Sequence, residues 1–160
     1  MRACLRLISL LLLFFPQPSL ASKIAQTEIA DSVVTDSVEI RQFNLLLQVR
    51  GEELSGIFVM QLMPQEKVIG TLINEFGMTA FDFEYNDGDT DLSNLPAFLD
   101  HWFIRRILEG DLSFFFSHLR MQQNVEKRSR LLTFLSNGDI ILWNKKFKIK
   151  YTFTPIIEEE

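Results

Sequence analysis

The chain has 160 residues, 47% of them hydrophobic, and a formal net charge of −5. This length allows one domain with a substantial core, and the negative charge argues against a general nucleic-acid-binding protein. The only cysteine, Cys4, lies near the N-terminus, so the rest of the chain offers no disulfide, no thiolate nucleophile and no thiolate metal site.

Residues 1–21 have the pattern of a cleavable secretory signal. Two arginines precede an apolar run at residues 7–15, and Ser19 and Ala21 place small residues where a signal peptidase reads them. The run is shorter than the about 20 residues that a transmembrane helix needs. We therefore expect cleavage after Ala21. A cysteine-free secreted domain fits the bacterial periplasm, and the protein could lie peripheral to the outer membrane.

After the signal, the sequence predicts a helix or linker at residues 22–37, one domain at 38–155 and an acidic tail at 156–160. The domain begins with a hydrophobic period of two, which is typical of half-buried strands with short connections. This pattern predicts an antiparallel meander. Its strands are expected at Phe43–Val49, Phe58–Leu62, Val68–Leu72 and Thr79–Tyr85.

The middle of the domain changes from strand to helix. Residues 86–94 are rich in turn formers and predict a loop. Apolar residues then recur at helical spacing over Leu95–Leu119. Gly110 is expected to end a first helix, and Asp111 to cap a second, shorter one that carries Phe114–Phe116. These three aromatic residues either seal the core or form an exposed patch that touches a membrane.

Strands resume in the last third of the chain. Residues 130–136 and 139–143 flank Asn137-Gly138, a strong two-residue hairpin signal. A final strand is expected over Phe147–Phe153. The fold class is therefore α+β, with a curved antiparallel sheet, or half-barrel, of about seven or eight strands lidded by helices.

Two groups of carboxylates invite a chemical interpretation. Asp87–Asp91 alternates acidic residues as a calcium loop does, but it lacks the order of an EF-hand, so a solvated loop is favoured. Glu75, Asp82 and Glu84 could supply an acid–base pair. Asp82 and Glu84 share one strand face, which favours the solvent side of a half-buried strand.

Other catalytic signals are lacking. His101 and His118 are the only histidines, and their spacing does not suit a local metal site. The sequence has no Gly-x-Ser-x-Gly elbow, no HExxH motif and no phosphate-binding glycine loop. We therefore expect a non-enzymatic protein with no cofactor and no metal.

The basic residues are concentrated late in the chain. His118–Tyr151 holds eight Lys/Arg against two Asp/Glu, whereas Ser22–Ser117 holds six against sixteen. Lys146, Lys148 and Lys150 share one face of the expected final strand. They predict a surface for an acidic protein or for the anionic headgroups of a membrane. Alternatively, lysines on an edge strand prevent sheets from pairing.

The 15 phenylalanines suggest a second kind of site. A concave sheet lined by Phe and Met could leave room for an apolar ligand. The alternative is that these side chains fill the core. The residues expected to line the cavity are Phe58, Met60, Leu72, Phe81, Phe83 and Phe147.

The stretch Asn74–Gly77 followed by Phe81–Phe83, read as NEFG-x-x-x-FDF, resembles a group of uncharacterised Gram-negative envelope proteins. Leu54–Gln61 is similar to them too. The order of elements resembles the half-barrel shared by the periplasmic lipoprotein carrier and the outer-membrane lipoprotein receptor. That resemblance implies a curved sheet that holds acyl chains, although the anchoring cysteine of many such proteins is missing here.

Two functions follow from these observations. The first is a periplasmic binding protein that holds acyl chains of a lipid, or a lipidated protein, in an apolar concavity. The second is an envelope interaction or assembly protein with a filled core, which docks a partner through its basic strand. Neither involves nucleic acid.

Overall fold

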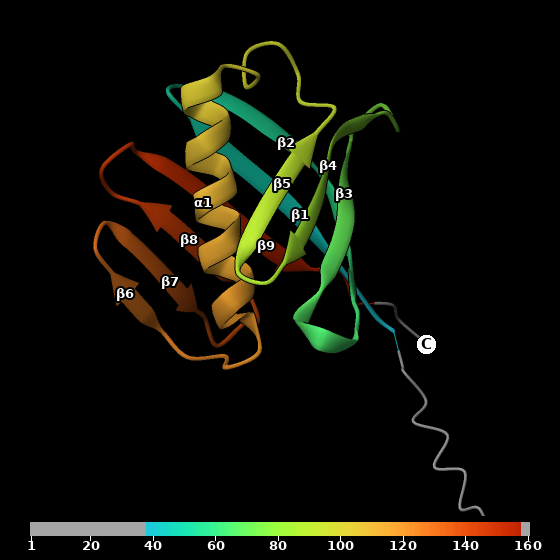
Figure 1. Cartoon of the computed structure of the whole chain (residues 1–160), viewed down its shortest axis with the longest axis vertical. Helices are drawn as coiled ribbons and strands as arrows, with labels where there is room; N and C mark the ends of the chain where they lie inside the picture. The colour runs from blue at the N-terminus through green and yellow to red at the C-terminus, as the bar shows by residue number, and fades with distance from the viewer. Residues whose placement is uncertain (1–37, 158–160) are drawn as a thin grey trace, which may run out of the picture. The chain divides into compact units, whose positions relative to one another are not determined.

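The computed structural model describes residues 38–157. Over this range the chain forms one antiparallel sheet and one α-helix (Figure 1). The strands are β1 (Glu39–Val49), β2 (Glu52–Leu62), β3 (Val68–Asn74), β4 (Thr79–Asn86), β5 (Asp89–Ser93), β6 (Val125–Lys127), β7 (Arg130–Phe134), β8 (Ile140–Asn144) and β9 (Ile149–Pro155). The helix is α1 (Trp102–Leu119), and a short 3₁₀ turn, η2 (Pro64–Glu66), joins β2 to β3. The expected signal and the helix or linker at 22–37 lie outside the described residues.

The strands follow the order β5-β4-β3-β2-β1-β9-β8-β7-β6. The first and last strands therefore pair at the centre of the sheet. The edge strands β5 and β6 do not pair with each other, so the sheet stays open. Helix α1 connects these two edges along the chain, and the sheet curls around it (Figure 1).

The sheet has nine strands rather than seven or eight, because the loop predicted at residues 86–94 is wrong. Asn86 pairs with Asp89, and the two residues between them, Asp87 and Gly88, have φ of 50° and 91°. This is the two-residue turn with positive φ at both positions that Asp-Gly favours, because its twist matches that of the strands. The chain therefore returns as β5 instead of leaving the sheet.

The same type of turn joins β1 to β2. Val49 pairs with Glu52, while Arg50 and Gly51 have φ of 53° and 91°. The turn is so tight that the Arg50 side chain stands at its tip. The predicted hairpin around Asn137-Gly138 also forms, but with a longer loop, in which the Gly138 amide donates to the Leu135 carbonyl (3.0 Å).

The two predicted helices are one. Residues 97–99 form a turn, and α1 then runs without interruption from Trp102 through Gly110 to Leu119. A Cβ at position 110 would lie 2.8 Å from Nη2 of Arg130, so this glycine makes room for an arginine rather than ending the helix. No helix within residues 38–157 is long and apolar enough to cross a membrane.

The core lies between α1 and the concave face of the sheet. Every strand except β6 and β7 contributes several buried side chains to the core, β7 contributes Leu132, and α1 buries side chains along most of its length. Phe114, Phe115 and Phe116 are 8%, 0% and 5% exposed, so they seal the core and the exposed-patch alternative for them is wrong. Burial of this much apolar surface is the main force that holds the helix on the sheet.

Candidate functional site

Five of the six residues expected to line an apolar cavity lie together on the concave face beneath α1. Phe58, Met60 and Leu72 are completely buried, and Phe81 and Phe83 are nearly so. The sixth residue, Phe147, is not in the final strand. It lies in the turn between β8 and β9 and is half-buried.

The aromatic rings of this face contact one another and α1. Phe58 stacks on Phe83 with ring centres 4.6 Å apart, and Phe83 stacks on Phe116 of the helix at 5.3 Å. Phe115 of the helix stacks on Phe153 of β9 at 4.4 Å. The space between these rings is therefore filled by their own side chains.

Gly70 makes this stacking possible. It is the position on β3 that pairs with Phe83, and a Cβ there would lie 2.4 Å from Cζ of that ring and 2.1 Å from the Val59 carbonyl oxygen. The missing side chain leaves room for the Phe83 ring to lie across the strand. Close packing of this kind gives the core a single arrangement.

Three hollows lie elsewhere on the molecule. Two, of about 520 and 710 Å³, are lined mainly by side chains that alternate with the core residues, so they open on the outer face of the sheet. The third, of about 450 Å³, lies where α1 ends beside the start of β1. None of the three collects the predicted cavity residues.

The three predicted contact lysines do not share a strand face. Lys146 and Lys148 lie in the turn between β8 and β9, and Lys148 has a φ of 54° that ends the extended pattern. Lys150 is in β9, where it pairs with Gln48 and Trp143 of the two neighbouring strands. Because β9 lies at the centre of the sheet, the edge-strand explanation of these lysines is wrong.

Lys146 belongs instead to a cluster of aromatic rings and cations, which we call the aromatic–basic end. It consists of Arg50, Trp102, Phe103, Lys146, Phe147 and Lys148. The rings of Trp102 and Phe103 meet edge to face at 5.8 Å, and Phe103 meets Phe147 in the same way at 5.5 Å. The Lys146 ammonium lies 5.1 Å from the Phe147 ring and the Arg50 guanidinium 6.0 Å from the Phe103 ring, both within cation–π range.

The topology brings these residues together from three separate segments. The β1–β2 turn, the beginning of α1 and the β8–β9 turn all lie at one end of the sheet, because β1 and β8 both run toward it and α1 starts there. Trp102 is 79% exposed and Phe103 37%. The sequence contains a signal for Trp102, because this residue recurs at helical spacing with Arg105 and Arg106 rather than with the buried apolar stripe of the helix.

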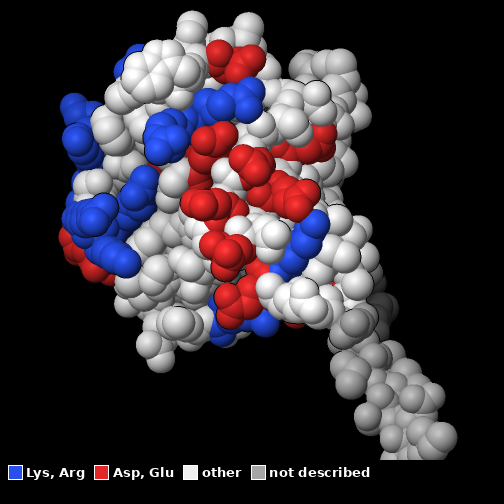
Figure 2. Space-filling model, viewed as in Figure 1, with Lys and Arg blue, Asp and Glu red and all other residues white. Residues whose placement is uncertain are grey.

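Three cations of this end stand without an ion pair. Among residues 38–157, Arg50, Lys146 and Lys148 form no ion pair, whereas Lys145 pairs with Glu126 and Arg105 with Asp100. Figure 2 shows basic side chains along the side of β6–β8 and acidic ones gathered near β5. The face seen in Figure 2 is therefore divided by charge.

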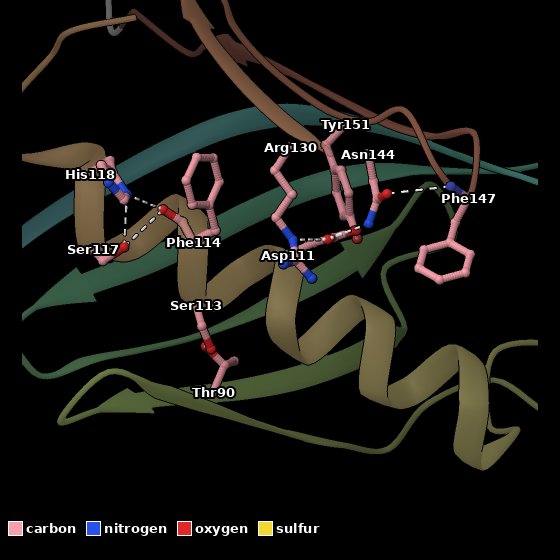
Figure 3. Close-up of polar contacts among 10 residues, drawn as sticks. All are labelled: Thr90, Asp111, Ser113, Phe114, Ser117, His118, Arg130, Asn144, Phe147 and Tyr151. Atoms are coloured by element: carbon pink, nitrogen blue, oxygen red, sulfur yellow. Dashed lines mark hydrogen bonds and ion pairs between the residues drawn. The ribbon is translucent and has the colours of Figure 1, made fainter. Parts of the chain in front are cut away.

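A buried polar cluster lies behind this end and ties α1 to three strands (Figure 3). The Asp111 carboxylate is fully buried and accepts hydrogen bonds from Arg130 Nε (2.5 Å), Asn144 Nδ2 (2.7 Å) and the Tyr151 hydroxyl (3.2 Å). Asn144 also accepts a bond from the Phe147 amide (3.3 Å), so the cluster holds the β8–β9 turn as well. The buried carboxylate of Asp111 is therefore surrounded by hydrogen-bond donors, as a buried charge requires.

The pKa shifts of this cluster follow from its burial. Desolvation raises the pKa of the Asp111 carboxyl, although the bonded Arg130 works against that rise. Desolvation and the nearby Asp111 charge raise the pKa of Tyr151. Both groups are inaccessible to a substrate, so the cluster acts as a structural anchor and not as a catalytic site.

The other predicted polar candidates have separate partners. Glu75 accepts a bond from Ser55 (2.6 Å), Asp82 from Asn94 (2.6 Å), and Glu84 pairs with Lys67 (2.7 Å). They therefore do not converge on one point. In the described part of the chain, no group of three or more His, Cys, Asp or Glu side chains could hold a metal ion.

Comparison with known proteins gives no relative, since no family model and no curated protein matches the chain. The inference of function depends on the geometry.

Proposed function

We propose that the protein is a non-enzymatic interaction module of the bacterial cell envelope that docks on its partner through the aromatic–basic end. The observation that carries this proposal is the exposed Trp102, which stands beside Phe103 among cations without ion pairs. Large exposed aromatic residues in a group are typical of contact surfaces. The expected export signal supports the envelope as the compartment.

The packing of the core also supports a surface interaction. Phe58, Phe83 and Phe153 are buried against one another and against α1, so the concave face is occupied without a ligand. Of the two functions expected from sequence, this favours the interaction protein. The docking surface then consists of two turns and the first residues of α1 rather than one basic strand.

The test removes the cations and measures binding to envelope membranes. The variant Arg50→Gln/Lys146→Gln/Lys148→Gln should lose most of its co-sedimentation with crude Gram-negative envelope fractions, and added salt should weaken binding of the parent protein. All three side chains are exposed, so folding should be unchanged, which circular dichroism checks.

A matched control carries the same charge change at the opposite end. Arg41, Lys67 and Arg120 lie at the start of β1, before β3 and after α1. Their triple glutamine variant should bind envelope fractions as the parent does. Equal loss in both variants, or no loss in either, would refute docking through the aromatic–basic end.

The acyl-carrier function is the second candidate. It is favoured by the gathering of five predicted lining residues on the concave face of a half-barrel-like sheet beneath a single helix. Because Phe83 stacks on Phe116 of α1, a cavity of several hundred Å³ would require the helix to move away. Native mass spectrometry should then show co-purified lipid. A uniform ligand-free mass, with no uptake of a fluorescent fatty acid, would eliminate this candidate.

A further inference from the structure

We infer that the partner of the aromatic–basic end is a lipid bilayer that contains anionic phospholipid. This inference rests on the proposed function and names the partner of the same surface. Its ring cluster would enter the headgroup region, and its cations would lie beside the lipid phosphates.

The chemistry of the cluster matches the boundary of a bilayer. Tryptophan prefers the interface between lipid and water, because its large ring is apolar while its N–H can still be hydrated. Trp102 is the most exposed ring of the cluster, and Phe103 and Phe147 pack behind it. Arg50 and Lys146 flank these rings, where they would meet phosphates as the rings enter.

The shape of this end also favours a bilayer over a peptide or another extended chain. The end is built from tips, namely the two-residue turn at Arg50, the β8–β9 turn and the first residues of α1. The three hollows described above lie on the outer face or at the opposite end of the sheet. A surface made of protruding tips suits a broad and deformable partner.

The charge distribution would orient the molecule. Asp87 and Asp89 lie at the β4–β5 turn, which is at the other end of the strands. Burial raises the pKa of the Tyr85 hydroxyl, and the charges of Glu66, Asp87 and Asp89 raise it further. The end that carries the β4–β5 turn would therefore be repelled by anionic lipid, while the aromatic–basic end is attracted. Near the docking end, Asp100 is paired with Arg105. Glu52, Glu53 and, in the β3–β4 turn, Glu75 are exposed there as well and subtract from the attraction.

Further exposed apolar residues lie at this end of the strands. Phe98 lies in the turn before α1 and is 43% exposed. Phe76 and Met78 are exposed in the β3–β4 turn, which lies at the same end of the strands. Their exposure adds apolar area that a bilayer can cover.

The experiment uses residues 22–160, the chain expected after signal cleavage, and protein-free vesicles. We expect it to float with vesicles of phosphatidylethanolamine and phosphatidylglycerol, to ignore vesicles of phosphatidylcholine alone, and to be released by high salt. Each cation near an anionic surface contributes about fivefold in affinity, so the triple glutamine variant at positions 50, 146 and 148 should lose roughly a hundredfold. Trp102→Ala should lose about tenfold through its apolar surface.

The two tryptophans report the orientation. Trp143→Phe leaves Trp102 as the only tryptophan, and its emission should shift to the blue and be quenched by brominated lipid when vesicles are added. Trp102→Phe leaves Trp143, which is 42% exposed on the outer face of β8 and should respond less. A larger response from Trp143 would overturn the proposed orientation.

The outcomes separate this inference from the proposed function. If the protein binds crude envelope fractions through Arg50, Lys146 and Lys148 but ignores anionic vesicles, the bilayer inference fails and a protein partner is indicated. If it binds neither, both proposals fail. If the opposite-end variant loses vesicle binding as much as the triple variant does, binding is non-specific and the inference is overturned.

Discussion

Replacing Asp111 by alanine tests what anchors α1 to the second half of the sheet. The change removes the acceptor of three hydrogen bonds from Arg130, Asn144 and Tyr151. Asn144 and Tyr151 are 0% and 1% exposed, so their donors would be left without a partner, at about 1–3 kcal/mol each. The Arg130 side chain is 25% exposed and can turn toward water, so the loss of its bond to Asp111 should cost less. Removing the desolvated carboxylate offsets part of the cost, and we expect a net destabilisation of about 3 kcal/mol.

Thermal and urea unfolding followed by circular dichroism measure this loss. For a domain of this size, it corresponds to a fall in Tm of about 10 °C. Asp100→Ala is the matched control, because it removes a carboxylate that pairs with Arg105 on the surface near the same helix. An exposed pair contributes about 0–1 kcal/mol, so Tm should change little. Equal effects of the two substitutions would refute the anchoring role of the buried cluster.

Three further changes test the packing and the buried charge. Burial raises the pKa of Asp111 above its ordinary 3.8, so between the unfolded and folded pKa values the folded protein keeps a proton that the unfolded chain releases. The free energy of unfolding should therefore fall as pH rises between these two values. Asp111→Asn should flatten this slope in urea titrations at several pH values. Gly70→Ala should lower the free energy of unfolding by about 3 kcal/mol or prevent folding, because the new Cβ would collide with the Val59 backbone. Gly77→Ala is the control: the position has open space but a φ of 76°, so the same assay should show a loss of only about 1–2 kcal/mol. Phe115→Ala should cost about 3–5 kcal/mol, and a smaller loss would mean that the core is loosely packed.

The first four strands could be predicted from sequence because one face of each is more deeply buried than the other. Such strands show a period of two whatever their tertiary partners. The prediction failed where a tertiary contact decided the local structure. Gly110 reads as a helix end, but it lies inside α1 because Arg130, twenty residues later, passes beside it.

Turn chemistry explains two further differences. Asp87-Gly88 is a strong hairpin signal, but the alternating carboxylates around it suggested a solvated loop. The strand expected from Phe147 onward starts only at Ile149, because the φ of 54° at Lys148 turns the chain before β9. In both places a single backbone conformation outweighs the side-chain pattern.

The aromatic–basic end could be predicted only in part. Lys146 and Phe147 were identified as contact and cavity residues, but their proximity to Arg50 and Trp102 depends on the order of strands. That order places the first and last strands side by side, which no local pattern reveals. Sites assembled from distant turns therefore need the register of the sheet before their residues can be grouped.

The two proposed functions make opposite demands on α1. Docking requires the helix to stay in place, so that Trp102 and Phe103 remain beside Phe147. Uptake of an acyl chain requires the helix to leave the concave face, which separates those rings. Asn144 couples the two, because its side chain bonds both the Asp111 carboxylate and the Phe147 amide. Weakening the buried cluster should therefore impair docking at a bilayer and favour uptake of an acyl chain. A variant such as Asp111→Ala, if it still folds, distinguishes the two functions by the sign of its effect.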